Sequence, residues 1–152
     1  MKDETFNELT GILEAISQTL GMGVSIIDAR FTILWVNVVL QKKGFMLNNV
    51  KGSFYRKTFD NAESIDEDDP TYKSVTSGTI IDTVKRGNDN REYRLIDIPV
   101  KDSKGNVEFV IEMTYDIDSY NDEMVHKLKD FIIERELKMT ELKHQIKALK
   151  EG

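Results

Sequence analysis

The sequence predicts an α+β domain in which a helical crossover interrupts a five-stranded antiparallel sheet between strands two and three, with a helix before and after it. Three observations support this prediction. Short segments rich in β-branched or alternating apolar residues are separated by turn sequences, as in antiparallel sheets. A stretch without strand periodicity lies between the second and third segments. Helical apolar patterns precede the first strand and follow the last.

An amphipathic helix is predicted for residues 1–20. Its apolar residues recur at spacings of three and four, which places on one stripe Phe6, Leu9, Ile12, Leu13, Ile16 and Leu20. Gly21 and Gly23 follow this stripe and are expected to end the helix. We expect the stripe to contribute to a dimer interface.

Two strands, residues 24–28 and 32–36, are predicted to form a hairpin around the short polar turn Asp28-Ala29-Arg30. Asn37 follows the second strand. Its side-chain oxygen can accept a hydrogen bond from the first turn of a helix over residues 38–43. The asparagine therefore predicts a helix N-cap at the start of the crossover.

The rest of the crossover, residues 45–69, lacks a clean period and predicts short helical turns and loop. It ends in an acidic stretch whose Asp69, with Pro70, suits the N-cap and first position of a helix that includes residues 72–77. Three strands follow, over residues 79–86, 91–100 and 107–115. In the last strand, alternation places on one face Val107, Phe109, Ile111, Met113 and Tyr115.

A heptad pattern predicts a coiled-coil helix over residues 118–152, after a domain of residues 21–117. Alternating steps of three and four join the seam positions Val125, Leu128, Ile132, Arg135, Met139, Leu142, Ile146 and Leu149. A helix this polar needs a partner helix, so we expect a parallel homodimer. Arg135 occupies a seam position where leucine is typical. We hypothesise that it fixes the register of the coiled coil or keeps the coil switchable, through an ion pair with Glu134 or Glu136 across the interface. The alternative is that a partly exposed seam position tolerates the arginine without any functional role for it.

Composition narrows the function classes. A chain of 152 residues fits one domain with an appendage. Its net charge of −6 argues against nucleic-acid and anionic-membrane partners. The absence of cysteine excludes disulfides, thiolate nucleophiles and cysteine-ligated metal. No signal peptide and no apolar run of about 20 residues is present, so we expect a cytoplasmic protein.

The order of these elements resembles the PAS family of sensory domains, of the bacterial or archaeal type. The residues that carry the likeness are Gly23 to Phe31, Trp35-Val36-Asn37, Ser74 to Gly78, and Tyr115-Asp116-Ile117-Asp118. Asn37 matches an asparagine that recurs in the family. The last motif resembles the family's Asp-Ile-Thr exit motif, with Asp118 in place of threonine. The likeness covers roughly residues 15–118.

The resemblance implies a cup-shaped sheet that binds a small molecule or cofactor. It does not imply an enzymatic reaction. It implies a sensory module of a signal-transduction protein, such as a two-component histidine kinase or a transcriptional regulator. Neither output domain is in this chain, so a further domain or a partner protein is expected. Large residues that could line the pocket, with the capping asparagine, are Trp35, Asn37, Phe45, Phe54, Tyr55, Phe59, Tyr72, Tyr93 and Met113. Signal relay is expected through Tyr115, Asp116, Ile117 and Asp118.

The cofactor stays unknown. A covalent flavin photoadduct of the family's Asn-Cys type is excluded because the chain has no cysteine. Haem held by histidine is not expected, because His126 and His144 both lie in the C-terminal helix, although other axial ligands stay open. His126 lacks the acidic neighbour and later proline of a kinase phosphoacceptor box. The carboxylates of residues 60–69 lack the spacing of a calcium loop, so no metal site is predicted.

Two other functions stay open. A ligand-free scaffold with a filled core would dimerise its output partner and would lack a pocket. A small enzyme using Asp and Tyr side chains in the cup would need a base with a defined orienting partner, and the sequence does not supply one.

Overall fold

The computed structural model describes residues 3–87, 89–119, 123 and 125–135, and the predicted α+β fold is confirmed there. Every strand and helix expected within these residues is present, and most bounds agree within about two residues. In order along the chain the elements are α1 (Asp3–Leu20), β1 (Gly23–Asp28), β2 (Ile33–Val36), α2 (Val38–Lys42), α3 (Leu47–Val50), α4 (Tyr55–Asp60), α5 (Pro70–Ser77), β3 (Ile81–Arg86), β4 (Glu92–Lys101) and β5 (Val107–Asp116). A 3₁₀ turn (Ile117–Ser119) follows, and residues 125–135 are helical.

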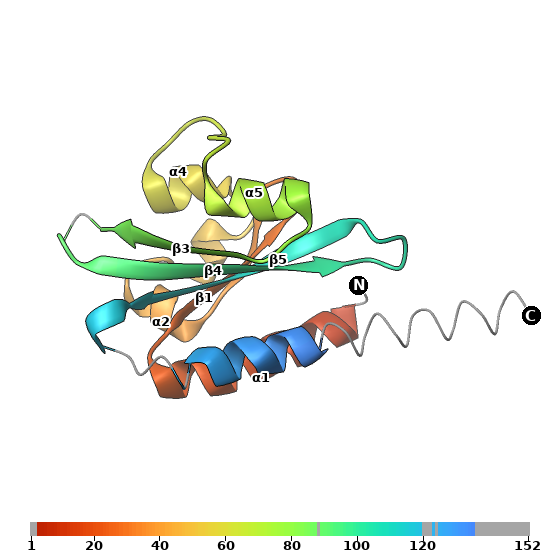
Figure 1. Ribbon diagram of the computed structural model, residues 1–152, viewed down its shortest axis with the longest axis horizontal. Helices are drawn as coiled ribbons and strands as arrows, with labels where there is room; N and C mark the ends of the chain where they lie inside the picture. The colour runs from red at the N-terminus through yellow and green to blue at the C-terminus, as the bar shows by residue number, and fades with distance from the viewer. Residues whose placement is uncertain (1–2, 88, 120–122, 124, 136–152) are drawn as a thin grey trace, which may run out of the picture.

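The five strands form one antiparallel sheet in the order β2-β1-β5-β4-β3. The first and last strands of the domain are therefore neighbours, although the paired residues Asp28 and Phe109 lie 81 positions apart in the sequence (109 − 28). In Figure 1 α1 and the blue helical residues 125–135 lie on one side of the sheet, while α4 and α5 lie on the other. We call the first side the outer face and the second the inner face.

The outer face is apolar because alternate residues of β1, β4 and β5 point to it. Its core combines these residues with both terminal helical segments: Leu9, Leu13, Met22, Val24, Ile26, Ile96, Ile98, Val100, Phe109, Ile111, Met113, Tyr115, Val125, Leu128 and Ile132. A smaller cluster around Ile27, Ile33 and Val50 lies on the other side of the sheet, with residues of α2, α3 and α4 packed against it. The two clusters fix the sheet between two helical layers.

The predicted seam positions Val125, Leu128 and Ile132 lie in this outer-face core rather than on an exposed stripe. They are 1%, 3% and 3% exposed and pack against the chain's own sheet and α1. The heptad spacing is also compatible with a helix packed on a sheet, since a coiled-coil helix and a sheet-packed helix each need one apolar stripe. Arg135 lies 3.9 Å from Glu8 of the same chain, and the contact predicted for it across a dimer interface stays a prediction. Met139, Leu142, Ile146 and Leu149 lie outside the described residues.

Asn37 is the N-cap of α2, as predicted, and it also joins three elements. Its Oδ1 accepts hydrogen bonds from the backbone N–H groups of Leu40 (3.2 Å) and Val24 (3.1 Å). Its Nδ2 donates to Ser17 Oγ (2.9 Å) and to the Met22 carbonyl (2.7 Å). The side chain is completely buried. All its hydrogen-bonding groups are used inside the fold, so it positions α1, β1 and α2 relative to one another.

The helix α5 begins and ends at the predicted residues. Asp69 Oδ2 accepts from the backbone N–H groups of Thr71 (3.0 Å) and Tyr72 (3.2 Å), and Pro70 occupies the first helical position. Gly78 ends the helix with φ of 66°, a left-handed conformation that favours glycine. This capping fixes Thr71 against the inner face, where the candidate site lies.

Candidate functional site: a cavity on the inner face of the sheet

A cavity of about 250 Å³ lies between the inner face of the sheet and the crossover helices α2, α4 and α5. Its wall mixes rings and aliphatic groups with a polar floor formed by strands. The lining residues are Ser25, Leu40, Lys43, Phe45, Tyr55, Phe59, Asp60, Asp69, Pro70, Thr71, Lys85, Gly87, Tyr93, Leu95, Glu112 and Thr114. This is less than the roughly 300–1,000 Å³ of sites for drug-sized ligands. The volume suits a small metabolite.

The floor is polar because the inward residues of three neighbouring strands are polar. Ser25 of β1 pairs with Glu112 of β5, and Glu112 pairs with Asp97 of β4, so the three form one row across the sheet. Asp97 is completely buried and Ser25 is 2% exposed. A carboxyl pair on adjacent central strands is unusual, since like charges directly opposite destabilise a sheet.

Thr71 bridges this carboxyl pair. Its hydroxyl oxygen lies 3.1 Å from Asp97 Oδ1 and 2.9 Å from Glu112 Oε2. A hydroxyl group has one hydrogen and can donate to only one of these oxygens. The other contact is a hydrogen bond only if that carboxyl carries a proton and donates to Thr71. The geometry therefore indicates a carboxyl pair that holds at least one proton.

The electrostatics agree with this geometry. Burial raises the pKa of Asp97 well above its ordinary range, and the neighbouring Glu112 raises it further. Burial also raises the pKa of Glu112. Burial raises the pKa of Tyr55 too, and the hydrogen bond that its hydroxyl donates to Asp69 acts in the same direction. The carboxyl pair therefore keeps a proton up to a higher pH than the same groups do in water.

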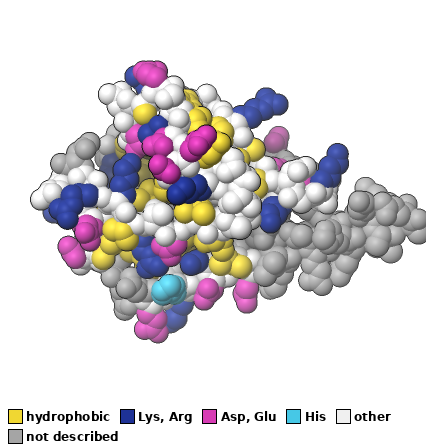
Figure 2. Space-filling view, turned by 45° about the horizontal axis from the view of Figure 1, so that its top comes forward, with side chains coloured by type: hydrophobic (Ala, Val, Ile, Leu, Met, Phe, Trp, Pro, Cys, Tyr) yellow, Lys and Arg dark blue, Asp and Glu magenta, His cyan; other side chains and the backbone are white. Residues whose placement is uncertain are grey.

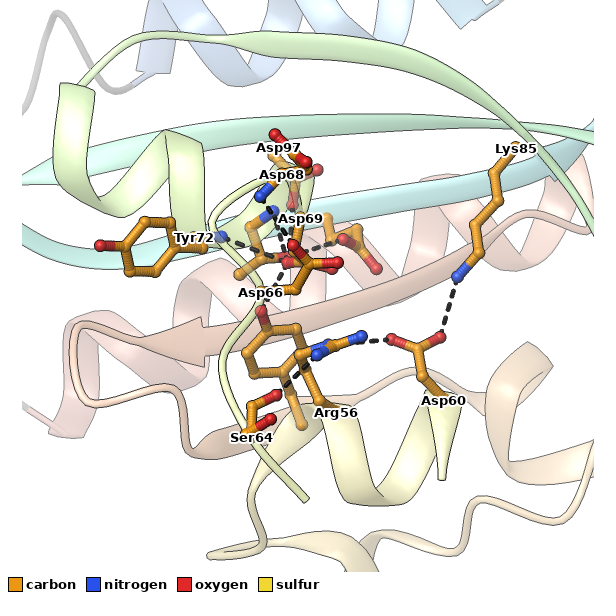
Figure 3. A network of polar contacts seen from close by, with 12 residues as sticks. Arg56, Asp60, Ser64, Asp66, Asp68, Asp69, Tyr72, Lys85 and Asp97 are labelled. Atoms are coloured by element: carbon orange, nitrogen blue, oxygen red, sulfur yellow. Dashed lines mark hydrogen bonds and ion pairs between the residues drawn. The ribbon is translucent and has the colours of Figure 1, made fainter. Parts of the chain in front are cut away.

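The rim near α4 is an ion-pair network (Figure 3). Asp60 lies 3.0 Å from Lys85 Nζ of β3 and 3.8 Å from Arg56 Nε. Arg56 also donates to the Ser64 carbonyl at 2.6 Å, which holds the loop after α4. These contacts tie α4 to the edge strand. In Figure 2 acidic, basic and hydrophobic side chains are interspersed over the visible face, without a large area of one charge.

Four of the residues predicted for the pocket line this cavity: Phe45, Tyr55, Phe59 and Tyr93. The other five lie elsewhere. Trp35 and Met113 point to the outer face and pack in its core. The side-chain amide of Asn37 is occupied by its hydrogen bonds to α1, β1 and α2. Phe54 packs in the smaller inner cluster, and Tyr72 stacks on Phe31 with ring centroids 5.7 Å apart. Residue size alone did not reveal which face of a strand or helix each side chain occupies.

Five polar residues of the lining were not predicted from the sequence: Ser25, Asp69, Thr71, Glu112 and Thr114. Nor was Asp97, which contacts Thr71 beside them. Asp97 lies between Ile96 and Ile98, and Glu112 between Ile111 and Met113. Alternation of this kind normally places the charged residue in solvent. One signal in the sequence could have identified them. The strands that carry Asp97 and Glu112 are interior strands of the predicted sheet, and the crossover must cover one face of that sheet, so alternate charged residues face the crossover.

The predicted relay residues lie at the end of β5. Tyr115 is buried on the outer face, and its hydroxyl accepts a hydrogen bond from Arg94 at 3.1 Å. Asp116 accepts from the backbone N–H of Asp118 at 3.0 Å and lies 3.2 Å from Arg91 Nη1. These bonds fix the first turn after the sheet, Ile117–Ser119.

Within the part of the chain that the structure describes, no group of three or more His, Asp or Glu side chains is placed to hold a metal ion. His126 is exposed on the C-terminal helical segment, and His144 lies outside the described residues. Among the described helices, none combines the length and apolarity required to cross a bilayer.

No family model and no curated protein matches the chain. Solved structures do match. A sensory box sensor histidine kinase from Vibrio cholerae has a TM-score of 0.54 and 14% identity, over 77% of this chain and 98% of that one. The PAS domain of the histidine kinase ThkA has a TM-score of 0.51 and 16% identity, over 62% and 98%. An RNA-binding light-oxygen-voltage receptor has a TM-score of 0.55 and 17% identity, over 84% and 38%. The chain has the PAS fold.

Proposed function

We propose that this chain is a sensory module that binds a small ligand in the inner-face cavity and passes the bound state to its C-terminal helix. The module performs no reaction itself. The fold supports a sensory role, because structures with the same fold include domains of sensor kinases and a light receptor. The cavity supports ligand binding, because a module that only dimerised its partner would need no such volume.

The observation that carries the proposal is the two-sided character of β5. Glu112 and Thr114 of this strand line the cavity. Met113 and Tyr115, which alternate with them, contact the core that includes α1 and residues 125–135. A shift of the central strand by a ligand would therefore change the surface on which the C-terminal helical segment rests. Packed cores respond to such shifts by changing between discrete arrangements.

The output is proposed to be a homodimer that works in the cytoplasm with a further domain or a partner protein. A largely apolar groove between α1 and the C-terminal helical segment is lined by Ala15, Ile16, Thr19, Leu20, Lys127, Leu128 and Phe131. Phe131 is 39% exposed there. The rest of the heptad seam, Met139 to Leu149, would extend this contact as a parallel coiled coil.

A native mass spectrum of the freshly purified chain tests ligand binding and dimerisation together. We expect a dimer that carries an additional non-covalent mass. The variant Thr114→Leu should fill the cavity and lose the extra mass, while the matched variant Thr76→Leu on the exposed side of α5 should keep it. A dimer without extra mass in repeated preparations would favour the scaffold function. A monomer would contradict the coiled-coil part of the proposal.

A further inference from the structure

The carboxyl groups of the cavity floor, and Asp97 beside it, have no cationic partner in the described part of the chain. Its ion pairs involve other acidic residues, and none includes Asp69, Asp97 or Glu112. The two lysines of the cavity wall, Lys43 and Lys85, are exposed, and Lys85 already pairs with Asp60. Solvent screens exposed charges far more than buried ones. Among the charged groups of the wall, the half-buried Glu112 is therefore less screened than the exposed lysines.

One polar side chain of the cavity wall lacks a hydrogen-bond partner among the described residues. Ser25 lines the cavity and is 2% exposed as a residue, and its hydroxyl makes no hydrogen bond there. An unpaired polar group in a buried residue costs about 1–3 kcal/mol. Such a hydroxyl on the wall of a cavity indicates a ligand that supplies the missing partner.

The geometry supplies three acceptors in one place. Glu112 and Ser25 are paired across β5 and β1, and Thr114 is the next inward residue of β5. All three line the cavity. A primary ammonium group has three N–H donors. The aromatic rings of Phe45, Phe59, Tyr55 and Tyr93 line the same cavity, and aromatic faces attract organic cations.

We propose that the ligand of this cavity is a small organic cation with a primary ammonium group, which lies between the Glu112 carboxylate and the hydroxyls of Ser25 and Thr114. The carbon skeleton of the cation contacts the aromatic wall. Asp97 acts through Glu112, because the proton that the pair shares can reside on Asp97 and leave Glu112 ionised. This inference rests on the proposed sensory function and names the chemical class of its ligand.

Three probes of equal size test the inference: benzylammonium, benzyl alcohol and benzoate. Each is titrated into the ¹⁵N-labelled full chain, and the amide signals of Ser25, Glu112 and Thr114 are followed. We expect benzylammonium to shift these signals and to bind at least about tenfold more tightly than the others, the ratio that one charge-assisted hydrogen bond can give. Equal or tighter binding of benzoate or benzyl alcohol would overturn the cation assignment but leave a ligand cavity.

Two variants sharpen the test. Glu112→Gln keeps the shape of the floor and should weaken benzylammonium binding about tenfold or more. Glu67→Gln removes the same charge from an exposed position before α5 and should leave binding unchanged. Amide spectra of both variants show whether they fold. If folded Glu112→Gln binds as the parent does, the inference is wrong. If none of the three probes shifts the cavity signals, both the cation assignment and the ligand-binding function fail.

Discussion

Arg94 of β4 donates two hydrogen bonds to the Asp82 carboxylate of β3, at 2.8 Å from Nε and 2.6 Å from Nη2. The pair lies on the outer face, beside the C-terminal helical segment. Lys129 of that segment lies 3.7 Å from the same carboxylate. Arg94 also donates to the buried Tyr115 hydroxyl. One acidic side chain on the edge strand thus connects the end of β5 with the helix that leaves the domain.

We predict that Asp82→Asn loosens residues 125–135 from the sheet, because it removes the charge that pairs with both Arg94 and Lys129. Hydrogen exchange of amides 125–135 should become faster, and the free energy of unfolding should fall by about 1 kcal/mol. Glu92→Gln breaks the exposed pair with Arg86 on the same two strands and serves as the control. Equal exchange in the parent and in Asp82→Asn would exclude this contact from helix docking.

Asn37→Ala should lower the free energy of unfolding by about 3 kcal/mol, because it leaves buried partners without hydrogen bonds on α1, β1 and α2. Chemical denaturation measures the change. Asn49→Ala, at an exposed position of α3, should change stability by less than about 0.5 kcal/mol. A change of less than about 1 kcal/mol in Asn37→Ala would mean that water replaces the hydrogen bonds of the lost side chain.

The carboxyl pair predicts an unusual pH dependence of stability. The pKa of Asp97 is raised by folding, so the folded state holds a proton that the unfolded state releases. Its contribution to stability is full below the ordinary carboxyl pKa and is lost as the pH rises through the raised pKa. The groups facing it are Glu112, Thr71 and Asp69.

Asp97→Asn should therefore stabilise the chain near neutral pH by about 1 kcal/mol, since the amide donates a hydrogen bond without titrating. The gain in melting temperature should be larger at alkaline than at acidic pH, because Asp97 loses its proton as the pH rises through its raised pKa. Asp68→Asn, at an exposed position, should show no such trend. A constant or negative shift across this range would contradict the shared proton.

Leu128→Ala should lower the free energy of unfolding by about 3 kcal/mol through a cavity in the outer-face core. The loss should be the same at low and high protein concentration, because Leu128 packs against its own chain. Phe131→Ala, at the exposed neighbouring position, should change stability little and dimer affinity more. If the effect of Leu128→Ala grew with protein concentration, the residue would belong to the dimer seam as first expected.

The elements were predictable because their signals are local. The apolar stripe of α1, the Asn37 cap and the Asp69-Pro70 start of α5 each depend on neighbours in the sequence. The cavity was harder, because its walls come from residues far apart in the chain. Periodicity identifies the two faces of β4 and β5 but not which helices cover them. Asp97 and Glu112 therefore resembled solvent-facing residues, and Trp35 and Met113 resembled pocket residues.

The shared proton of Asp97 and Glu112 also bears on how long the protein persists. After this proton is counted, an empty cavity leaves Glu112 without a cationic partner, and a cation that binds there stabilises the folded state. The ligand-free chain then unfolds more often, and proteases in a cell degrade unfolded chains first. Under the proposed function, the ligand would set not only the state of the exit helix but also the number of sensor molecules present.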